Sequence, residues 1–135
     1  MCIRDRLWIR TGSDPQFMGM LGMHGTYQAN MAMHNADLII AIGARFDDRI
    51  TNDPKQFALG AKKIHIDVDA ASVSKIIHAD VPIVGSAKDC ISSLIQELKS
   101  RDLKLNTDAI SAWNKQVDDF INLFIPCRYC ICIEF

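Results

Sequence analysis

The 135-residue sequence has no surplus of charge of either sign, with 15 Lys and Arg residues against 16 Asp and Glu residues. A nucleic-acid partner is therefore not expected, because neutralising phosphates requires a clustered basic excess. No apolar run reaches the roughly 18 residues that span a bilayer, so we expect no membrane partner. Hydrophobic residues make up 49% of the chain and charged residues 23%, which excludes disorder over its whole length.

Cysteine is scarce in the body of the chain. Cys90 lies there, whereas Cys2, Cys127, Cys130 and Cys132 lie near the two ends. A secreted protein held together by disulfides spreads its cysteines through the fold, so we expect a reducing compartment, the cytoplasm. The cysteines between 127 and 132 lack a second ligand pair at zinc-ribbon spacing, and we therefore expect no metal site.

The two ends of the chain differ in pattern from its body. Residues 1–16 show no helical or strand periodicity and lack the continuous apolar core of a secretory signal. We interpret them as an artefact joined to the reading frame. Residues 121–135 become abruptly apolar and rich in cysteine, and we interpret them as an aberrant tail. The predicted domain is the body, residues 17–120.

Strand and helix patterns alternate along this body. Short apolar or alternating runs rich in β-branched residues predict strands over 37–43, 63–69 and 81–85. Pro82 favours an edge position, or a strand start, for the third of these. The intervening segments predict helices over 26–35, 70–77, 87–101 and 107–120. Strands alternating with helices predict an α/β fold, a three-layer parallel sheet flanked by helices.

The glycine-rich loop from Gly19 to Gly25 is the first candidate for binding a ligand. In open parallel sheets, ligands bind beyond the carboxyl ends of the strands. Glycine lets the backbone approach a ligand closely, and the start of the following helix offers free N–H groups. The pattern is G-x-x-G-x-x-G and not the dinucleotide motif G-x-G-x-x-G, so the loop taken by itself favours an ordinary connecting turn over a ligand site.

Two charged segments follow the predicted strands. The segment from Gly43 to Arg49 carries two arginines and two aspartates, which can bind phosphate or carboxylate, or pair with one another in a solvated turn. Asp67 lies where nucleotide-binding sheets place a partner for a ribose hydroxyl. Asp69 and Ser86 are equally suited to capping the helices that we predict after them.

Among the histidines, only His24 in the glycine loop is a candidate ligand. We expect His34 and His78 to be surface or packing residues, and His65 to face a helix layer from within its strand. The sequence contains no H-E-x-x-H motif and suggests no Ser-His-Asp or Cys-His catalytic arrangement.

Three of these motifs together resemble a known family. The glycine loop 19–25, the segment 35–49 that ends in GARFDDR, and HIDVD at 65–69 resemble the central domain of acetolactate synthases, also called acetohydroxyacid synthases. These enzymes depend on thiamine diphosphate, and the domain belongs to their large catalytic subunit. The resemblance runs from about Gly19 to Phe120. LGMHG followed by GARFDDR separates this family from more distant thiamine-diphosphate decarboxylases.

The resemblance implies a Rossmann-like six-stranded sheet that holds FAD, a flavin without a required redox role in the condensation. Three of the family's strands should precede Phe17, so the domain is incomplete in this chain. Ser86 departs from the aspartate common in the family, which puts the adenine-side contact there in doubt. The implied cofactor-binding residues are Leu21, Gly22, Met23, His24, Gly43, Ala44, Arg45, Phe46, Asp47, Asp67, Val68, Ser86 and Ala87. The implied substrate-binding residues are Met23, Asp48 and Arg49.

The resemblance also implies which parts of the enzyme this chain lacks. The family's catalytic glutamate belongs to a preceding domain, and the Gly-Asp-Gly…Asn motif for thiamine diphosphate and Mg²⁺ belongs to a following one. The chain has no Gly-Asp-Gly. We therefore expect no catalytic residue in this chain and no activity from it alone.

The implied activity condenses two molecules of pyruvate to 2-acetolactate, or pyruvate with 2-ketobutyrate to 2-aceto-2-hydroxybutyrate, in the biosynthesis of branched-chain amino acids such as valine and isoleucine. The implied partners are these 2-keto acids, further catalytic subunits in a homodimer or tetramer, and a small regulatory subunit. The alternatives are a stand-alone nucleotide-binding module for ADP or NAD, and a scaffold domain that contributes only dimer contacts.

Overall fold

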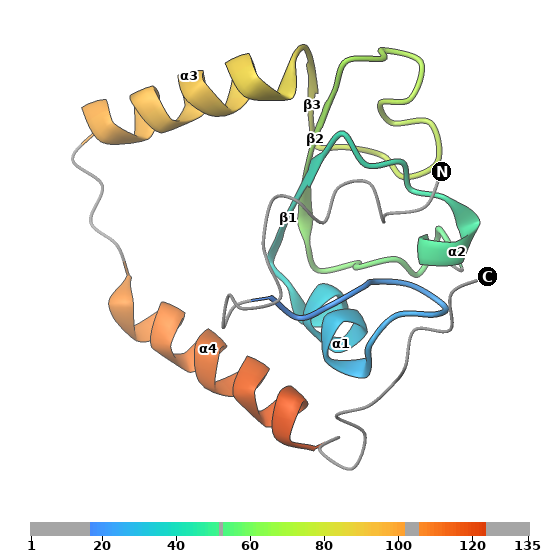
Figure 1. Ribbon diagram of the computed structural model, residues 1–135, viewed down its shortest axis with the longest axis vertical. Coiled ribbons are helices and arrows are strands. Elements are labelled where there is room, and N and C mark those ends of the chain that lie inside the picture. The colour runs from blue at the N-terminus through green and yellow to red at the C-terminus, as the bar shows by residue number, and fades with distance from the viewer. Residues whose placement is uncertain (1–16, 52, 102–105, 124–135) are drawn as a thin grey trace.

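The computed structural model describes residues 17–51, 53–101 and 106–123. The interpretations of segment 1–16 and of the cysteines at 127–132 lie outside these residues. The elements in chain order are α1 (Tyr27–Asn35), β1 (Leu38–Ile42), α2 (Asp48–Thr51), β2 (Lys62–Asp67), β3 (Val81–Val84), α3 (Ala87–Ser100) and α4 (Thr107–Asn122) (Figure 1). The three predicted strands are therefore confirmed, as are the predicted helices that became α1, α3 and α4.

The strands form one parallel sheet in the order β1-β2-β3. Ile66 of the central strand lies between Ile42 and Ile83 on its two neighbours and is only 1% exposed. Pro82 lies on β3, an edge strand of this sheet, as its missing N–H group predicts. The described residues thus form a small α/β sheet of the expected parallel kind.

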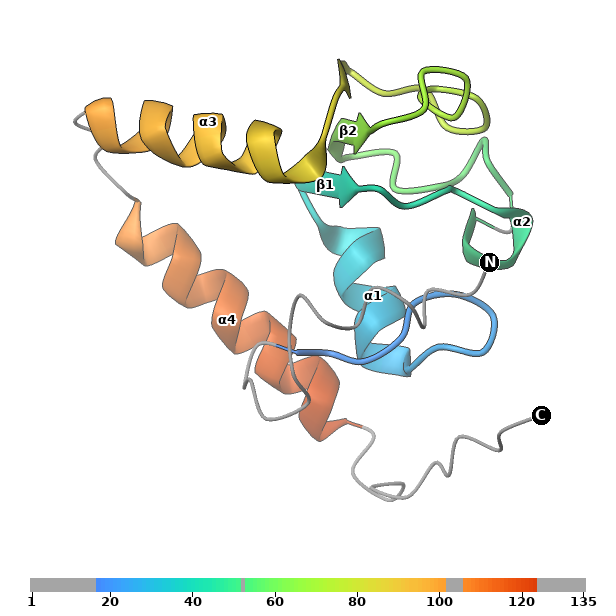
Figure 2. The ribbon, with the colours of Figure 1, turned by 45° about the horizontal axis from the view of Figure 1, so that its top comes forward.

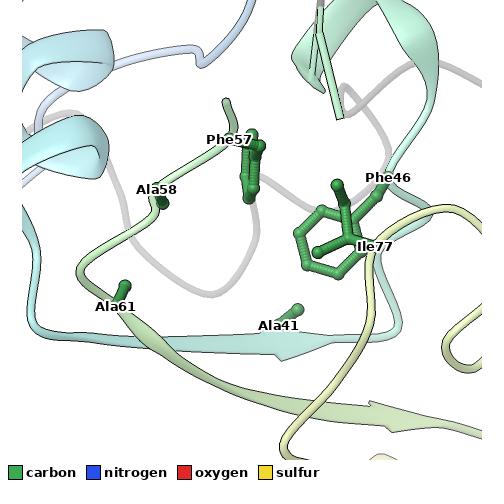
Figure 3. Close-up of a cluster of buried hydrophobic side chains, with 6 residues drawn as sticks. All are labelled: Ala41, Phe46, Phe57, Ala58, Ala61 and Ile77. Carbon is green, nitrogen blue, oxygen red and sulfur yellow. The ribbon is translucent and has the colours of Figure 1, made fainter. Parts of the chain in front are cut away.

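One buried cluster is built largely from the connections between strands (Figure 3). Phe46 and Phe57 meet edge to face, with their ring centroids 5.6 Å apart and an interplanar angle of 72°. This is a favourable arrangement for two aromatic rings. Met33 of α1 packs against the same cluster. Its buried members are Ala41, Phe46, Phe57, Ala58, Ala61 and Ile77.

The predicted helix over 70–77 is wrong, because the segment folds as a series of turns. The Asp69 carboxylate accepts hydrogen bonds from the Ala71 N–H and from the Ser72 hydroxyl. Ser74 has a positive φ of 58°, and its hydroxyl accepts a hydrogen bond from the Ala79 N–H. Such side-chain contacts to the backbone compete with the helical ladder, and a segment this short has little propagation to outweigh them.

Helices α3 and α4 leave apolar side chains uncovered. Neither helix has a buried residue, and Leu94, Ile95 and Leu98, which form an apolar stripe at helical spacing on α3, are all more than 40% exposed. Figure 2 shows α3 extending away from the sheet, with α4 returning to contact α1. Among the described helices, none is both long enough and apolar enough to cross a membrane. The apolar side chains of α3 and α4 recur at helical spacing, as expected of helices that pack against a larger domain than the part described.

We expect the 135-residue chain, produced alone, to self-associate and to melt without a cooperative transition. Leu38 and Ile40 of the edge strand β1 are 47% and 45% exposed, and α3 adds its own uncovered stripe. Exposed apolar strand edges and patches favour association between chains. Light scattering after gel filtration and differential calorimetry measure both properties. A soluble monomer with a sharp calorimetric transition would contradict this expectation.

Candidate functional site

The residues that directly follow β1 and β3 are hydrogen-bonded to the last two residues of β2. The Gly43 N–H donates to the Ile66 carbonyl at 2.6 Å, and the Gly85 N–H donates to the Asp67 carbonyl at 2.9 Å. The candidate segments 43–47, 67–68 and 86–87 therefore lie at one edge of the sheet, as parallel strands require. This edge is where the arrowheads of β1 and β2 point in Figure 2.

His65 anchors the first of these segments from the middle of β2. Its Nε2 lies 3.0 Å from the Ala44 carbonyl oxygen and must donate, because a carbonyl only accepts. The ring, 1% exposed, stands edge-on to Phe46 at a centroid distance of 5.2 Å. Its buried Nδ1 has no hydrogen-bond partner among the described residues. We expected His65 to face a helix layer, but the contacts found for it come from the connection after β1.

Part of the segment after β1 forms a helix that the sequence did not predict. The Asp47 carbonyl accepts hydrogen bonds from the Ile50 and Thr51 N–H groups, which closes the short helix α2. The Asp48 carboxylate accepts from the Arg49 N–H at 3.0 Å. An acidic residue in the first turn is favourable there, because the N-terminus of a helix is electropositive. The two aspartates of this segment therefore help to form a short helix in addition to contributing charge to the surface.

The two arginines of this segment differ in their surroundings. Arg45 Nε approaches the Asp47 carboxylate at 3.9 Å, and both side chains are at least 40% exposed, so this pair is loose. The Arg49 side chain is exposed and makes no ion pair within the described part of the chain. The solvated-turn alternative therefore describes Arg45 in part, whereas Arg49 has its guanidinium available for a ligand.

The glycine loop is held directly against α2. The Met23 N–H donates to the Arg49 carbonyl at 2.8 Å. Gly22 has a φ of +105°, and a Cβ there would lie 2.6 Å from the same carbonyl oxygen. We attributed the glycines of this loop to the close approach of a ligand, but at Gly22 the missing side chain admits the protein's own backbone. This contact joins two of the residues implied to bind substrate, Met23 and Arg49.

The remaining candidate residues differ in how accessible they are. Met23 and Val68 are 71% and 78% exposed, and His24 is exposed as well, so a ligand can reach these side chains without displacing protein. Asp67 is buried, and its Oδ1 accepts a hydrogen bond from the Asp69 N–H. Ser86 occupies the N-cap position of α3, but its hydroxyl makes no capping hydrogen bond.

Asp69 has a structural role different from the helix cap that the sequence predicts. The hydrogen bond from the Ser72 hydroxyl, followed by that from the Ala71 N–H, holds the pKa of its carboxyl below the usual value. Both donors stabilise the charged form. This carboxylate therefore shapes the turn after β2 and is already engaged by protein groups.

Two residues that shape the glycine loop were missed in the sequence. Asn30 hydrogen-bonds through its side chain to both the N–H and the carbonyl of Gly22, at 2.9 and 3.0 Å. The Thr26 hydroxyl donates to the Met18 carbonyl and also accepts from the Ala29 N–H as the N-cap of α1. The sequence signal that could have identified Asn30 is its position inside a predicted helix. An asparagine side chain is unfavourable there unless it makes a hydrogen bond.

No group of three or more His, Cys, Asp or Glu side chains able to hold a metal ion occurs among residues 17–51, 53–101 and 106–123. The edge of the sheet presents backbone groups, exposed apolar side chains, the two arginines and the carboxylates of Asp47 and Asp48. Such a surface suits an organic or anionic ligand with both apolar and charged parts.

Replacing Gly22 by alanine in a full-length protein that contains this chain should lower the melting temperature. The positive φ strains any other residue by about 1–3 kcal/mol, and the added Cβ collides with the Arg49 carbonyl. Gly60 is the matched control, because a Cβ there meets no atom within 4 Å and its φ is not positive. Gly60→Ala should change stability by no more than about 0.5 kcal/mol. Equal melting temperatures for the two variants would refute the close contact.

Comparison with known proteins identifies the family. Residues 9–94 match the model of the thiamine pyrophosphate enzyme central domain. The chain is 50% identical over 103 residues to the acetolactate synthase large subunit of Haemophilus influenzae, which covers 76% of this chain and 18% of that protein. It is 46% identical over 105 residues to the acetolactate synthase isozyme 3 large subunit of Escherichia coli, over 78% of this chain and 18% of that protein.

A more distant relative gives the same result. The probable acetolactate synthase large subunit of Methanocaldococcus jannaschii is 43% identical over 112 residues, which covers 83% of this chain and 18% of that protein. The chain spans about a fifth of the length of the curated relatives that it matches. The family match itself covers more than half of the chain, which therefore belongs to the thiamine pyrophosphate enzymes as part of their central domain.

Proposed function

We propose that this chain is part of the large catalytic subunit of an acetolactate synthase. The enzyme would decarboxylate pyruvate and add the resulting two-carbon unit to a second 2-keto acid, in branched-chain amino-acid biosynthesis. The names of the relatives support this activity. The observation that carries the proposal is the hydrogen bond from Met23 to Arg49, because it joins the two motifs that resemble this family in particular.

Within that enzyme, the chain would bind FAD along the carboxyl edge of the sheet. The exposed apolar side chains of Met23 and Val68 fit the aromatic rings of a flavin nucleotide, and the Arg45 guanidinium suits its diphosphate. The Asp67 carboxylate would accept a hydrogen bond from a ribose hydroxyl, because it follows the pattern of nucleotide-binding sheets. These donors and surfaces fit the group. Bound FAD would supply no electron transfer to the condensation and would act as a structural cofactor.

Thiamine diphosphate and Mg²⁺ would be held by other domains of the full-length enzyme. The contribution of this chain to the reaction would be the orientation of the second substrate. Arg49 extends from α2 without an ionic partner in the described part of the chain, so its guanidinium can hold a 2-keto acid by the carboxylate. Asp48 and Met23 would line the approach to it.

The assembly would contain two or four catalytic subunits and a small regulatory subunit, and would work in the cytoplasm. The uncovered apolar faces of β1 and α3 support burial of this part of the chain within a larger protein.

Val68→Asp in the full-length protein should raise the dissociation constant for FAD by about tenfold, equivalent to about 1.4 kcal/mol. The change removes an apolar contact and places a charged carboxylate against the aromatic part of the nucleotide. Leu59→Asp is the matched control, because Leu59 is also 78% exposed but precedes β2, at the opposite end of that strand. Flavin fluorescence after equilibrium dialysis measures binding. Equal FAD affinity in the two variants would place the flavin elsewhere.

Arg49→Ala in the full-length enzyme should raise the concentration of the second keto acid at half-saturation by about tenfold or more, since charge-assisted hydrogen bonds contribute about 1.5–3 kcal/mol. Arg49→Lys should restore this only in part, because a point charge lacks the geometry of the guanidinium fork. Arg101→Ala is the control, since Arg101 is an exposed arginine paired with Glu97 on α3.

The assay follows the formation of 2-acetolactate and 2-aceto-2-hydroxybutyrate together with the melting temperature. If unsubstituted enzyme loaded with FAD, thiamine diphosphate and Mg²⁺ forms neither product, the proposed activity is wrong. If it forms them and Arg49→Ala binds the acceptor normally, the assignment of Arg49 alone is wrong, whatever its melting temperature.

A further inference from the structure

We propose that Asn30 is a positioning residue that fixes where Arg49 presents its guanidinium to the second substrate. It would do so by holding the glycine loop against the backbone of α2. This inference rests on the proposed function of Arg49 and deepens it. No part of the motif resemblance assigns Asn30, which lies on α1 away from the strand ends.

The side chain of Asn30 hydrogen-bonds to both backbone polar groups of Gly22. Its Oδ1 accepts a hydrogen bond from the Gly22 N–H at 2.9 Å, and its Nδ2 donates to the Gly22 carbonyl at 3.0 Å. The two residues are eight positions apart, and both hydrogen bonds are partly buried. A side-chain amide can make both bonds at once because it carries a donor and an acceptor on separate atoms. The clamp therefore fixes the orientation of Gly22 as well as its position.

The orientation of Gly22 is linked to α2 through the carbonyl oxygen of Arg49, which lies against the loop in two ways. The next residue, Met23, donates its N–H to the Arg49 carbonyl at 2.8 Å. The side of Gly22 that would carry a Cβ faces the same carbonyl oxygen, at 2.6 Å from the ideal Cβ position. Rotation of the loop would therefore break the hydrogen bond or drive the backbone into Arg49. The hydrogen bonds of Asn30 to Gly22 and of Met23 to Arg49, with the peptide bond between Gly22 and Met23, therefore connect Asn30 to Arg49.

Arg49 is sensitive to such positioning because little else directs its side chain. In the part of the chain that the structure describes, its guanidinium has no ion pair. The short helix α2 has only four residues, so its own ladder supplies few constraints. The backbone anchor at its carbonyl, together with the hydrogen bond from its N–H to the Asp48 carboxylate, therefore fixes where the long side chain begins. A shift at that point displaces a bidentate carboxylate contact, whose geometry is strict.

The helix itself gives an independent reason to look for a role. Asn30 follows the buried Ala29 and precedes the buried Ala32 on α1. Alanine is a better residue for a helix interior than asparagine, so helix formation alone does not favour an amide here. The contribution of the side chain lies in the clamp on Gly22.

The test compares Asn30→Ala and Asn30→Asp with Asn35→Ala in the full-length enzyme loaded with FAD, thiamine diphosphate and Mg²⁺. The carboxylate introduced by Asn30→Asp cannot donate to the Gly22 carbonyl, although it still accepts from the Gly22 N–H. Asn35 is a matched control on the same helix, because its exposed amide donates to the Met31 carbonyl within α1 and has no other hydrogen bond within residues 17–51, 53–101 and 106–123. The measurements are kcat, the acceptor concentration at half-saturation with 2-ketobutyrate, and the melting temperature.

We expect Asn30→Ala to raise the half-saturating concentration of 2-ketobutyrate by about tenfold, equivalent to about 1.4 kcal/mol. Asn30→Asp should raise it too, and Asn35→Ala should leave it unchanged. This concentration does not depend on how much of the enzyme is folded, so a merely structural role would lower the melting temperature and kcat without moving it. Combining Asn30→Ala with Arg49→Ala should add little to the effect of Arg49→Ala, because both act through one contact.

Two results would overturn the inference alone. The first is an unchanged half-saturating concentration in both Asn30 variants. The second is failure of both variants to fold while Asn35→Ala folds, because Asn30 would then serve the fold and not the placement of Arg49. Absence of both products from the unsubstituted enzyme would instead overturn the proposed function, and this inference with it.

Discussion

The parallel pairing of three strands is the constraint on which the rest of this structure depends. Parallel pairing places every strand end at one edge, and the backbone hydrogen bonds from Gly43 to Ile66 and from Gly85 to Asp67 hold the following segments together there. His65 reinforces the arrangement from within the sheet by donating to Ala44. The exposed candidate residues that follow β1 and β2 gather at this edge because their segments leave the strands in the same direction. The glycine loop, which follows no strand among the described residues, joins them through the hydrogen bond from Met23 to Arg49.

Much of the fold could be predicted from the sequence, because its patterns are local. The strand β1 is a continuous apolar run, Pro82 marks β3 as an edge strand, and α3 carries apolar residues at helical spacing. Segment 70–77 could not be predicted, since its turns depend on hydrogen bonds to the side chains of Asp69 and Ser74. The spacing of apolar residues does not indicate such contacts. They compete with a helix only when the side chain and the backbone group that it binds already lie close together.

The segments that form the candidate site could be predicted from the sequence, but the contacts between these segments could not. Glycine and charge patterns mark the loop at 19–25 and the segment at 43–49, yet neither shows that Met23 donates to the Arg49 carbonyl. The reason for Gly22 lies in that contact between distant segments, and the partner of Asn30 lies eight residues away. Tertiary proximity of this kind is set by packing. Position and spacing alone therefore identify which segments matter, but not what each residue contacts.

The buried cluster has a consequence for how the length of this domain can vary. Connections between strands usually lie on the surface and accept insertions and deletions. Here Phe57, Ala58 and Ala61, from the connection before β2, supply half of the buried cluster, and Ile77 comes from the next connection. Changing the length of either connection would remove core side chains from the sheet. Natural and engineered length variation should therefore be confined to other parts of the chain, and these two loops should behave as core.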